Sequence, residues 1–154
     1  MKIGIVVYSQ TGNTYEVAQK LEEALSKKGN SVKIERIHVA DEKQRDLNKI
    51  QMLSIPDLST YDALVFGSPV HAFSLSHPMT AFMSQIPTLQ DKKITCFVTK
   101  GLPLNGTGGN QAIGVMKKIC ESKGGDVCGS GIIVWKKDRE KQISKISEEF
   151  SKMF

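Results

Sequence analysis

Short apolar runs alternate along this chain with longer segments in which apolar residues recur every three or four positions. The run at residues 3–7 is rich in β-branched residues and predicts a buried strand, and Ala-Leu-Val-Phe within residues 61–67 is typical of a central strand. Residues 32–37 alternate apolar and charged positions, which indicates a strand nearer a sheet edge. Two further strands are predicted at residues 93–99 and 127–135.

Helices are predicted between these strands. In residues 13–28, Val17, Leu21 and Leu25 recur every fourth position, Asn13 is a candidate cap, and Glu16 suits the positive end of the helix dipole. A weaker stripe of Leu47, Ile50 and Leu53 predicts a helix over residues 41–53. Further helices are predicted over residues 76–86 and 109–123, and apolar residues between positions 143 and 153 indicate a closing helix.

Five strand–helix units in succession predict an α/β protein with a doubly wound parallel sheet and helices on both faces. We expect residues 1–154 to form a single domain, because the length fits one domain of ordinary size. Ligands of open parallel sheets bind beyond the carboxyl ends of the strands. We therefore expect a ligand to bind at the loops that follow three of the strands, at residues 8–13, 68–75 and 100–108.

Composition narrows the classes of partner. The net charge is +5, but the lysines are scattered in pairs and none lies beside an aromatic platform, so we expect no nucleic-acid partner. Three cysteines without CxxC spacing indicate buried apolar side chains, no metal site and a reducing compartment. The first apolar run is too short for a signal peptide or a membrane span. We therefore expect a cytoplasmic protein with no membrane partner.

The loop after the first predicted strand suits a phosphate. It reads Tyr8-Ser9-Gln10-Thr11-Gly12-Asn13-Thr14, carries no charge and leads directly into a helix N-terminus. Free N–H groups and the helix dipole favour an anion there, and Gly12 allows close approach of the backbone. The absence of GxxxxGK followed by Ser or Thr, and of GxGxxG, argues against an NTPase loop and a dinucleotide site. An ordinary polar turn with a helix cap is the alternative.

The stretch Ile5-Val6-Val7-Tyr8-Ser9-Gln10-Thr11-Gly12-Asn13-Thr14 resembles the phosphate signature of the flavodoxin family, S/T-x-T-G-x-T after an apolar strand. The resemblance covers essentially the whole chain. It implies a flavodoxin-like sheet of five parallel strands in the order 2-1-3-4-5 and an FMN cofactor. It also implies that the FMN phosphate is held by Ser9, Gln10, Thr11, Gly12, Asn13 and Thr14.

The same resemblance assigns two later loops to the flavin ring and ribityl chain. The start of the second loop, Gly67-Ser68-Pro69, resembles the branch of FMN quinone reductases, and the glycine-rich third loop corresponds to the other side of the ring. The candidate contacts are Ser68, Pro69, Val70, His71, Ala72, Phe73, Thr99, Lys100, Gly101, Thr107, Gly108 and Gly109.

For residues of these two loops, roles without flavin contact are the alternatives. His71 either donates to a flavin oxygen or shuttles a proton, or it is a solvent-facing loop histidine. Phe73 either packs on the ring or covers the core. The third loop is either a flavin contact or a flexible surface loop.

Three functions are compatible with these residues, and none of them requires a catalytic side chain. The first is an electron carrier that cycles FMN by single electrons with a protein redox partner. The second is an FMN-dependent NAD(P)H:quinone-type oxidoreductase, whose pocket a homodimer would complete. The third is a sensor or scaffold module. The basic charge and the lack of Trp or Tyr in the two ring loops depart from typical flavodoxins.

Overall fold

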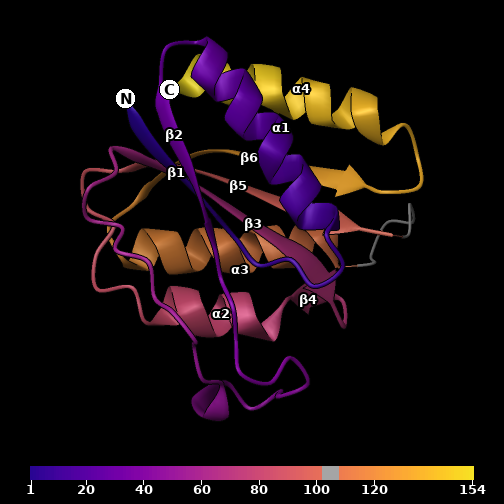
Figure 1. Cartoon of the computed structure of the whole chain (residues 1–154). Coiled ribbons are helices and arrows are strands. Elements are labelled where there is room, and N and C mark those ends of the chain that lie inside the picture. Colours follow the sequence, from indigo (N-terminus) through magenta and orange to yellow (C-terminus); the bar gives the residue numbers. More distant parts are fainter. Residues whose placement is uncertain (102–107) are drawn as a thin grey trace.

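The structure is a computed structural model that describes residues 1–101 and 108–154. Strands and helices alternate through it (Figure 1). Their bounds are β1 Lys2–Val7, α1 Asn13–Lys27, β2 Ser31–Arg36, the 3-10 turn η1 Leu47–Lys49, β3 Ala63–His71, β4 Ser74–Leu75, α2 His77–Ser84, β5 Lys93–Lys100, α3 Gly109–Ser122, β6 Asp126–Val134 and α4 Arg139–Met153.

The main sheet has the strand order β2-β1-β3-β5-β6, and each neighbouring pair is parallel. This is the predicted order, since β5 and β6 are the fourth and fifth strands of the predicted set. A further strand, β4, has two residues and pairs with β3 in the antiparallel sense. The expected five-stranded doubly wound sheet is therefore confirmed, with a short hairpin added at the end of β3.

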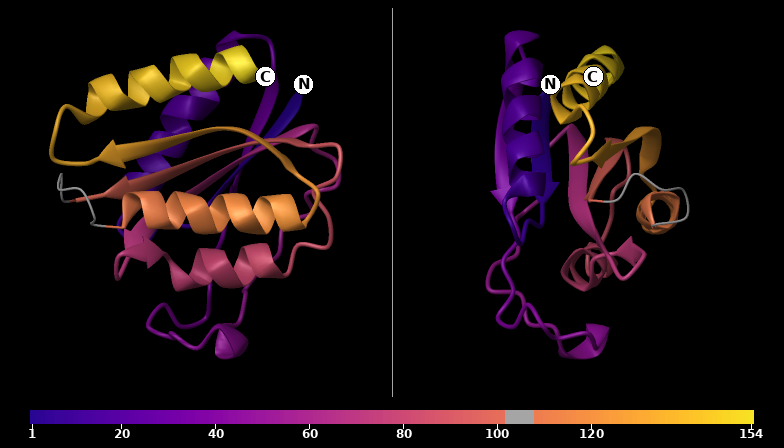
Figure 2. Two further views of the ribbon diagram at one scale, coloured as in Figure 1. Left: turned by 180° about the vertical axis from the view of Figure 1, so that it is seen from behind. Right: turned by 90° about the vertical axis from the view of Figure 1, so that its right-hand side faces the viewer.

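Helices α1 and α4 cover one face of the sheet, and α2 and α3 cover the other (Figure 2). Two buried clusters fill the spaces between these layers. β1 contributes side chains to both clusters, because successive residues of a strand point to opposite faces of the sheet. Ile3 and Ile5 belong to the cluster under α1 and α4, whereas Val6 and Tyr8 belong to the cluster under α2 and α3.

Helix α1 forms where its apolar spacing predicts, with Val17, Leu21 and Leu25 buried against the sheet. Its N-cap differs from the prediction. Gly12 occupies the cap position with φ of 97° and has no side chain to cap the helix, and Asn13 is the first helical residue. Glycine is favoured there because a left-handed backbone conformation costs it little.

The predicted helix over residues 41–53 is wrong. Only the turn η1 is helical, and the arms of the segment pair with each other through a bridge between Val39 and Met52. Ile50 is buried, whereas Leu47 and Leu53 are 42% and 67% exposed, so the three residues do not form one apolar stripe. The spacing of Leu47, Ile50 and Leu53 by three positions is compatible with a helix, which is why a helix was predicted. In the structure the three residues lie in a wide loop.

The predicted loop over residues 68–75 is a hairpin. β3 continues past Gly67 to His71, and His71 faces Ser74 across the ladder with β4. Ala72 and Phe73 form the turn with φ of 48° and 64°. Two consecutive left-handed residues are the mark of the tight turn that best matches the twist of a hairpin.

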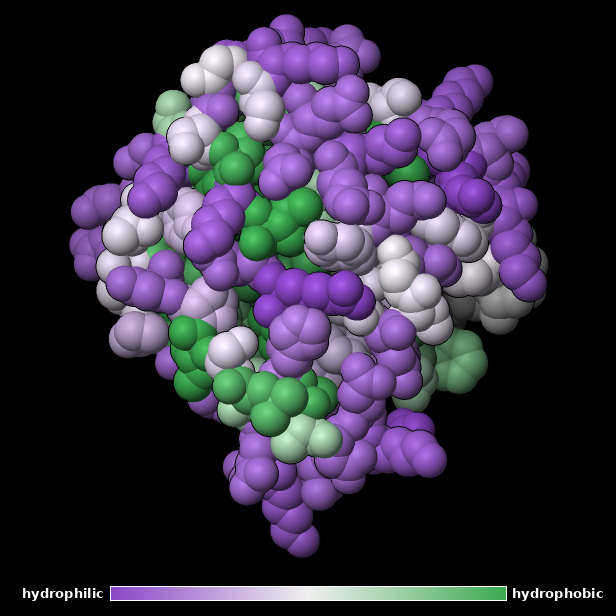
Figure 3. Space-filling model, in the orientation of Figure 1, coloured by the Kyte–Doolittle hydropathy of each residue, from purple (hydrophilic) through white to green (hydrophobic). Residues whose placement is uncertain are grey.

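The face seen in Figure 3 is largely hydrophilic, with apolar residues in small separate areas. Among the described residues, none of the helices is long and apolar enough to span a membrane.

Candidate functional site

The carboxyl ends of β1, β3 and β5 meet at one edge of the sheet. The Tyr8 amide donates to the Gly67 carbonyl over 3.1 Å, and Pro69 is in register with Thr99. The segments that follow these three strands therefore start side by side. The structure brings together the three regions that the sequence selected as candidate cofactor contacts, as far as their residues are described.

The first loop is held in shape by its own serine. The Ser9 hydroxyl accepts hydrogen bonds from the amides of Gly12 and Tyr15, at 3.1 and 3.2 Å. The Gly12 carbonyl then accepts from Glu16 and begins the helical ladder. Ser9 is buried, so its side chain organises the loop from below.

Four amides of this loop remain for an anion. Among the described residues, no acceptor bonds the amides of Gln10, Thr11, Asn13 and Thr14. A Cβ added at Gly12 would have no described residue within 4 Å beyond its chain neighbours, so the backbone is open to a ligand on the side of the described residues. Neighbouring free N–H groups at a helix N-terminus suit a phosphate, and the donor set fits that group.

A buried hydroxyl pair links the first loop to β5. Thr14 Oγ1 and Thr99 Oγ1 lie 2.9 Å apart, and both side chains are buried. One hydroxyl donates to the other, which leaves one hydroxyl hydrogen for a further partner. Two candidate residues that are 85 positions apart in the sequence are thus joined directly.

Sequence reasoning did not single out Arg36, which also contacts the first loop. Its guanidinium donates to the Ser9 carbonyl over 3.1 Å and lies over the Tyr15 ring at 4.7 Å. The available signal was topological, because β2 pairs with β1 and brings Arg36 level with Val7 just before the loop.

The β3–β4 turn packs against the start of α3. Phe73 is 64% exposed, but its backbone abuts Gly108, where an added Cβ would lie 2.3 Å from the Phe73 carbonyl carbon. Gly108 has φ of 99° and caps α3. The turn and this helix start are therefore fixed relative to each other.

His71 and Ser68 differ in how far their side chains are available. His71 is half-buried and meets the Tyr8 ring edge-on, with 6.2 Å between ring centroids. Burial, then His77 and Arg45, lower the pKa of His71, and Glu42 opposes them. Ser68 is fully buried, and its hydroxyl lies 2.7 Å from Ser76 Oγ at the cap of α2.

Tyr8 carries a buried hydroxyl beneath this region. Among the described residues, it has no hydrogen-bond partner of ordinary length. Burial, followed by the nearby carboxylate of Glu42, raises the pKa of Tyr8 to about 12.

The third region is described only at its two ends. Thr99 and Lys100 are the last residues of β5, and the Lys100 carbonyl accepts from the Trp135 amide over 2.8 Å. Among the described residues, none lies within 4 Å of a Cβ added at Gly101, whereas a Cβ added at Gly109 would lie 3.1 Å from Ile132. Thr107 lies outside the described residues.

A cleft of about 780 Å³ opens beside the first and second regions. Gln10 lines it from the first loop, and Val70, His71 and Ala72 line it from β3 and its turn. Residues 42–45, His77 and Pro78 complete the wall. Sequence reasoning missed residues 42–45 because it placed them in a helix, although positions 41–46 lack any apolar residue.

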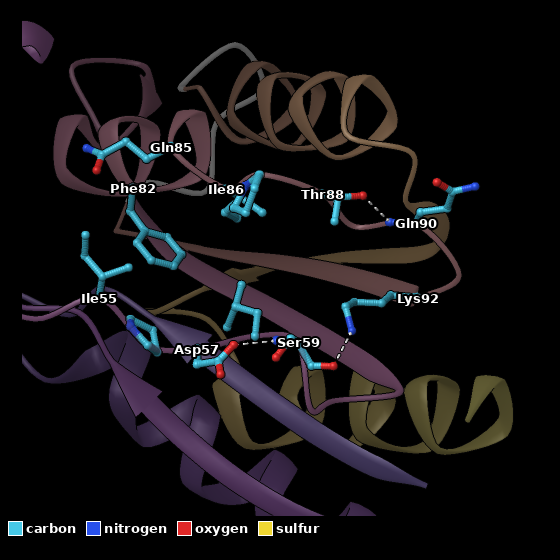
Figure 4. A pocket seen from close by; sticks show the side chains of 12 residues that line it. Ile55, Asp57, Ser59, Phe82, Gln85, Ile86, Thr88, Gln90 and Lys92 are labelled. Atoms are coloured by element: carbon cyan, nitrogen blue, oxygen red, sulfur yellow. Dashed lines mark hydrogen bonds between the residues drawn. The ribbon is translucent and has the colours of Figure 1, made fainter.

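Another cavity, of about 540 Å³, lies at the opposite edge of the sheet, before the starts of β3 and β5. Phe82 of α2 and Ile55 of the preceding loop point toward each other across it (Figure 4). Lys92 at its end donates to the Ser59 and Tyr61 carbonyls. It contains none of the candidate cofactor residues.

Solved structures with the same fold include flavodoxins and related flavoproteins. Oxidised flavodoxin 2 from Bacillus cereus has a TM-score of 0.72 at 19% identity, with 100% of both chains covered. A flavodoxin, WrbA-like protein from Agrobacterium tumefaciens reaches 0.75 at 16% identity, with 99% of this chain and 96% of that chain covered. A flavoprotein in complex with FMN from Lactobacillus acidophilus reaches 0.66 at 18% identity, covering 94% and 97%.

Comparison with curated protein sequences gives no significant match. The profile of the flavodoxin domain matches residues 5–152, which include the first loop, the β3 hairpin and the start of α3. With the sheet order and the loop geometry in agreement, the chain belongs to the flavodoxin domain family.

Proposed function

We propose that this protein binds FMN and transfers electrons with it. The observation that carries the proposal is the set of four available amides around Gly12, at the start of α1 and in a flavodoxin domain. The flavoprotein from Lactobacillus acidophilus was solved with FMN. In this proposal the phosphate contacts are Ser9, Gln10, Thr11, Gly12, Asn13 and Thr14, with Ser9 acting through its control of the loop.

The first loop holds an anion through neutral donors. The amides of Gln10, Thr11, Asn13 and Thr14 orient the phosphate, and the dipole of α1 adds a favourable potential. The hydroxyl hydrogen that the Thr14–Thr99 pair leaves over supplies a further donor. Riboflavin lacks the phosphate, so these groups favour FMN over riboflavin.

We assign the ring and ribityl contacts to the segments beyond β3 and β5. The proposed contacts are Ser68, Pro69, Val70, His71, Ala72, Phe73, Thr99, Lys100, Gly101, Thr107, Gly108 and Gly109. When bound, the flavin supplies the redox chemistry. The lowered pKa of His71 favours the neutral ring, in which one nitrogen accepts a hydrogen bond and the other donates one.

FMN and riboflavin titrations of the purified protein test the binding proposal. We expect FMN to bind at least about tenfold more tightly, which corresponds to one charge-assisted hydrogen bond to the phosphate. Equal affinity for the two flavins would exclude the phosphate site.

We propose a carrier role, with a protein redox partner, as the first function. A turn fixed against α3 and a hairpin fixed on β3 give the ring region rigid walls. Rigid walls suit electron exchange with a docked protein, because little reorganisation accompanies each transfer. Absorbance spectra during stepwise anaerobic reduction separate a one-electron course, expected of a carrier, from a direct two-electron course.

The cleft of about 780 Å³ beside His71 favours a second candidate, an NAD(P)H:quinone-type oxidoreductase. That volume gives room for a small-molecule substrate next to the proposed ring contacts. A direct two-electron course, together with rapid bleaching of the flavin by NADPH, would replace the carrier role with this one.

A further inference from the structure

Arg36 lies outside the phosphate-binding loop but contacts both of its ends. It is the last residue of β2, and neighbouring strand β1 leads into the loop. We propose that Arg36 is a positioning residue that holds this loop in its phosphate-binding shape and thereby sets the preference for FMN over riboflavin. This inference rests on the proposed function.

The contacts of Arg36 form a clamp. Its Nη2 donates to the carbonyl of Ser9, the first residue of the loop, over 3.1 Å. The same guanidinium lies 4.7 Å from the centroid of the Tyr15 ring, just after the loop. Since Ser9 Oγ also accepts from the Tyr15 amide, the two ends are tied to each other and to Arg36.

The first contact fixes the direction of a phosphate donor. The Ser9 carbonyl belongs to the same planar peptide as the Gln10 N–H, and in a trans peptide these two groups point in opposite directions. No cis peptide occurs among the described residues. With its carbonyl turned toward Arg36, this peptide must aim the Gln10 amide away from β2, where no described residue accepts it.

Arginine suits this task better than other cations. Its planar guanidinium can donate along its edge while its face stacks on an aromatic ring, so one side chain makes both contacts. Among the described residues, Arg36 joins no carboxylate, and its positive charge stays uncompensated by an ion pair. Arg36 is exposed, so solvent and salt screen the attraction of its charge for a phosphate. Its direct contacts with Ser9 and Tyr15 therefore contribute more to phosphate binding than its charge does.

The decisive variant is Arg36→Met, which keeps an unbranched side chain against Tyr15 and removes the donor. We expect FMN to bind about tenfold more weakly or worse, the size of a lost bond to a charged group. Riboflavin affinity should change by less than about twofold, because riboflavin has no phosphate for the loop to hold. Titration of both flavins into each protein measures the ratio directly.

Arg139→Met provides a matched control. Arg139 also lies 4.7 Å from an aromatic ring, that of Trp135, and it also touches the first turn of α1, through Glu16 at 3.9 Å. It donates no hydrogen bond to the first loop. We expect its FMN and riboflavin affinities to match those of the parent protein.

Two further measurements separate positioning from general stability. Arg36→Lys keeps one donor for the Ser9 carbonyl and should recover part of the lost FMN affinity. In the flavin-free protein, the Gln10 amide resonance should shift in Arg36→Met and remain in place in Arg139→Met. Thermal unfolding of each flavin-free variant verifies that it is folded.

The outcomes are distinguishable. Unchanged FMN affinity in Arg36→Met, an equal loss for FMN and riboflavin, or an equal loss in Arg139→Met would each overturn the clamp while the proposed function stands. If the parent protein binds neither flavin, the proposed function fails and the clamp falls with it.

Discussion

Thr11 and Thr14 lie three positions apart in the first loop, yet their surroundings differ. Thr11 is exposed, and its hydroxyl bonds no other described residue. Thr14 is buried and pairs with the Thr99 hydroxyl at 2.9 Å. The Thr11 hydroxyl is therefore available to bind a ligand, whereas the Thr14 hydroxyl also stabilises the fold.

Substitution of each threonine should separate these roles. Thr14→Val leaves the Thr99 hydroxyl buried without a partner, so the free energy of unfolding should fall by about 1–3 kcal/mol. Thr11→Ala should change it by less than about 0.5 kcal/mol. Each should weaken FMN binding by about 1–3 kcal/mol through a lost phosphate contact.

Urea unfolding of the flavin-free proteins and FMN titration measure the two effects independently. Thr14→Ser serves as the control, because it keeps the hydroxyl pair. Equal stability losses in Thr11→Ala and Thr14→Val would contradict the structural difference between them.

At the scale of elements, the site depends on contacts between a turn and a helix start. Gly108 caps α3 with a left-handed backbone and leaves no room for a Cβ beside Phe73. Both the conformation and the close approach require glycine here. Gly114 lies in the exposed interior of the same helix, and apart from the helix's own backbone no described atom lies within 4 Å of a Cβ added there.

Alanine at these two glycines should act in opposite directions. Gly108→Ala should lower the free energy of unfolding by about 2–4 kcal/mol through backbone strain and a clash. Gly114→Ala should raise it by about 0.5–1 kcal/mol, because alanine loses less freedom in a helix. Chemical denaturation of the two variants measures both effects, and equal destabilisation by both would contradict the predicted difference between the two sites.

The turn of the β3–β4 hairpin is itself strained. Ala72 and Phe73 both have positive φ, although neither is a glycine or asparagine. Replacing the pair by Asn-Gly should raise the free energy of unfolding by about 1 kcal/mol. Ala72→Val should lower it, because a β-branched residue tolerates this conformation poorly. The order of the three urea midpoints tests both statements.

The elements also show where sequence patterns predict structure and where they do not. β1, the first loop and α1 were predictable because their strand, loop and helix signals are consecutive in the sequence. The hairpin was not, since its turn lacks the glycine or asparagine that marks such turns. The contact of Arg36 with Ser9 depends on the pairing of β2 with β1, which a local pattern does not contain.

At the scale of the whole molecule, several titratable groups favour their protonated forms. Burial and Glu35 raise the pKa of Tyr61 to about 12, and burial and Glu42 do the same for Tyr8. The Cys120 thiol and burial raise the pKa of Cys96 as well. All three groups belong to the buried cluster under α2 and α3, so their effects bear on that side of the core.

Stability should therefore fall in alkali. A tyrosine with a folded pKa of about 12 and an unfolded value of 10.0 holds its proton more tightly when folded. Its contribution is complete below pH 10 and is lost as the pH rises toward 12. Urea midpoints measured from about pH 8 to pH 11 should decline, and Tyr61→Phe should decline less steeply. Parallel pH profiles for the two proteins would contradict this assignment.

The position of β1 inside the sheet has a consequence for synthesis on the ribosome. β1 pairs with β2 on one side and with β3 on the other, and its partner residues in β3 lie about 60 positions later, as in Ile3 and Ala63. One edge of β1, whose side chains are apolar, therefore keeps unpaired backbone N–H and C=O groups until β3 has emerged from the ribosome. Such edges are templates for wrong pairing. A chaperone that covers this edge early in translation would raise the yield of native protein.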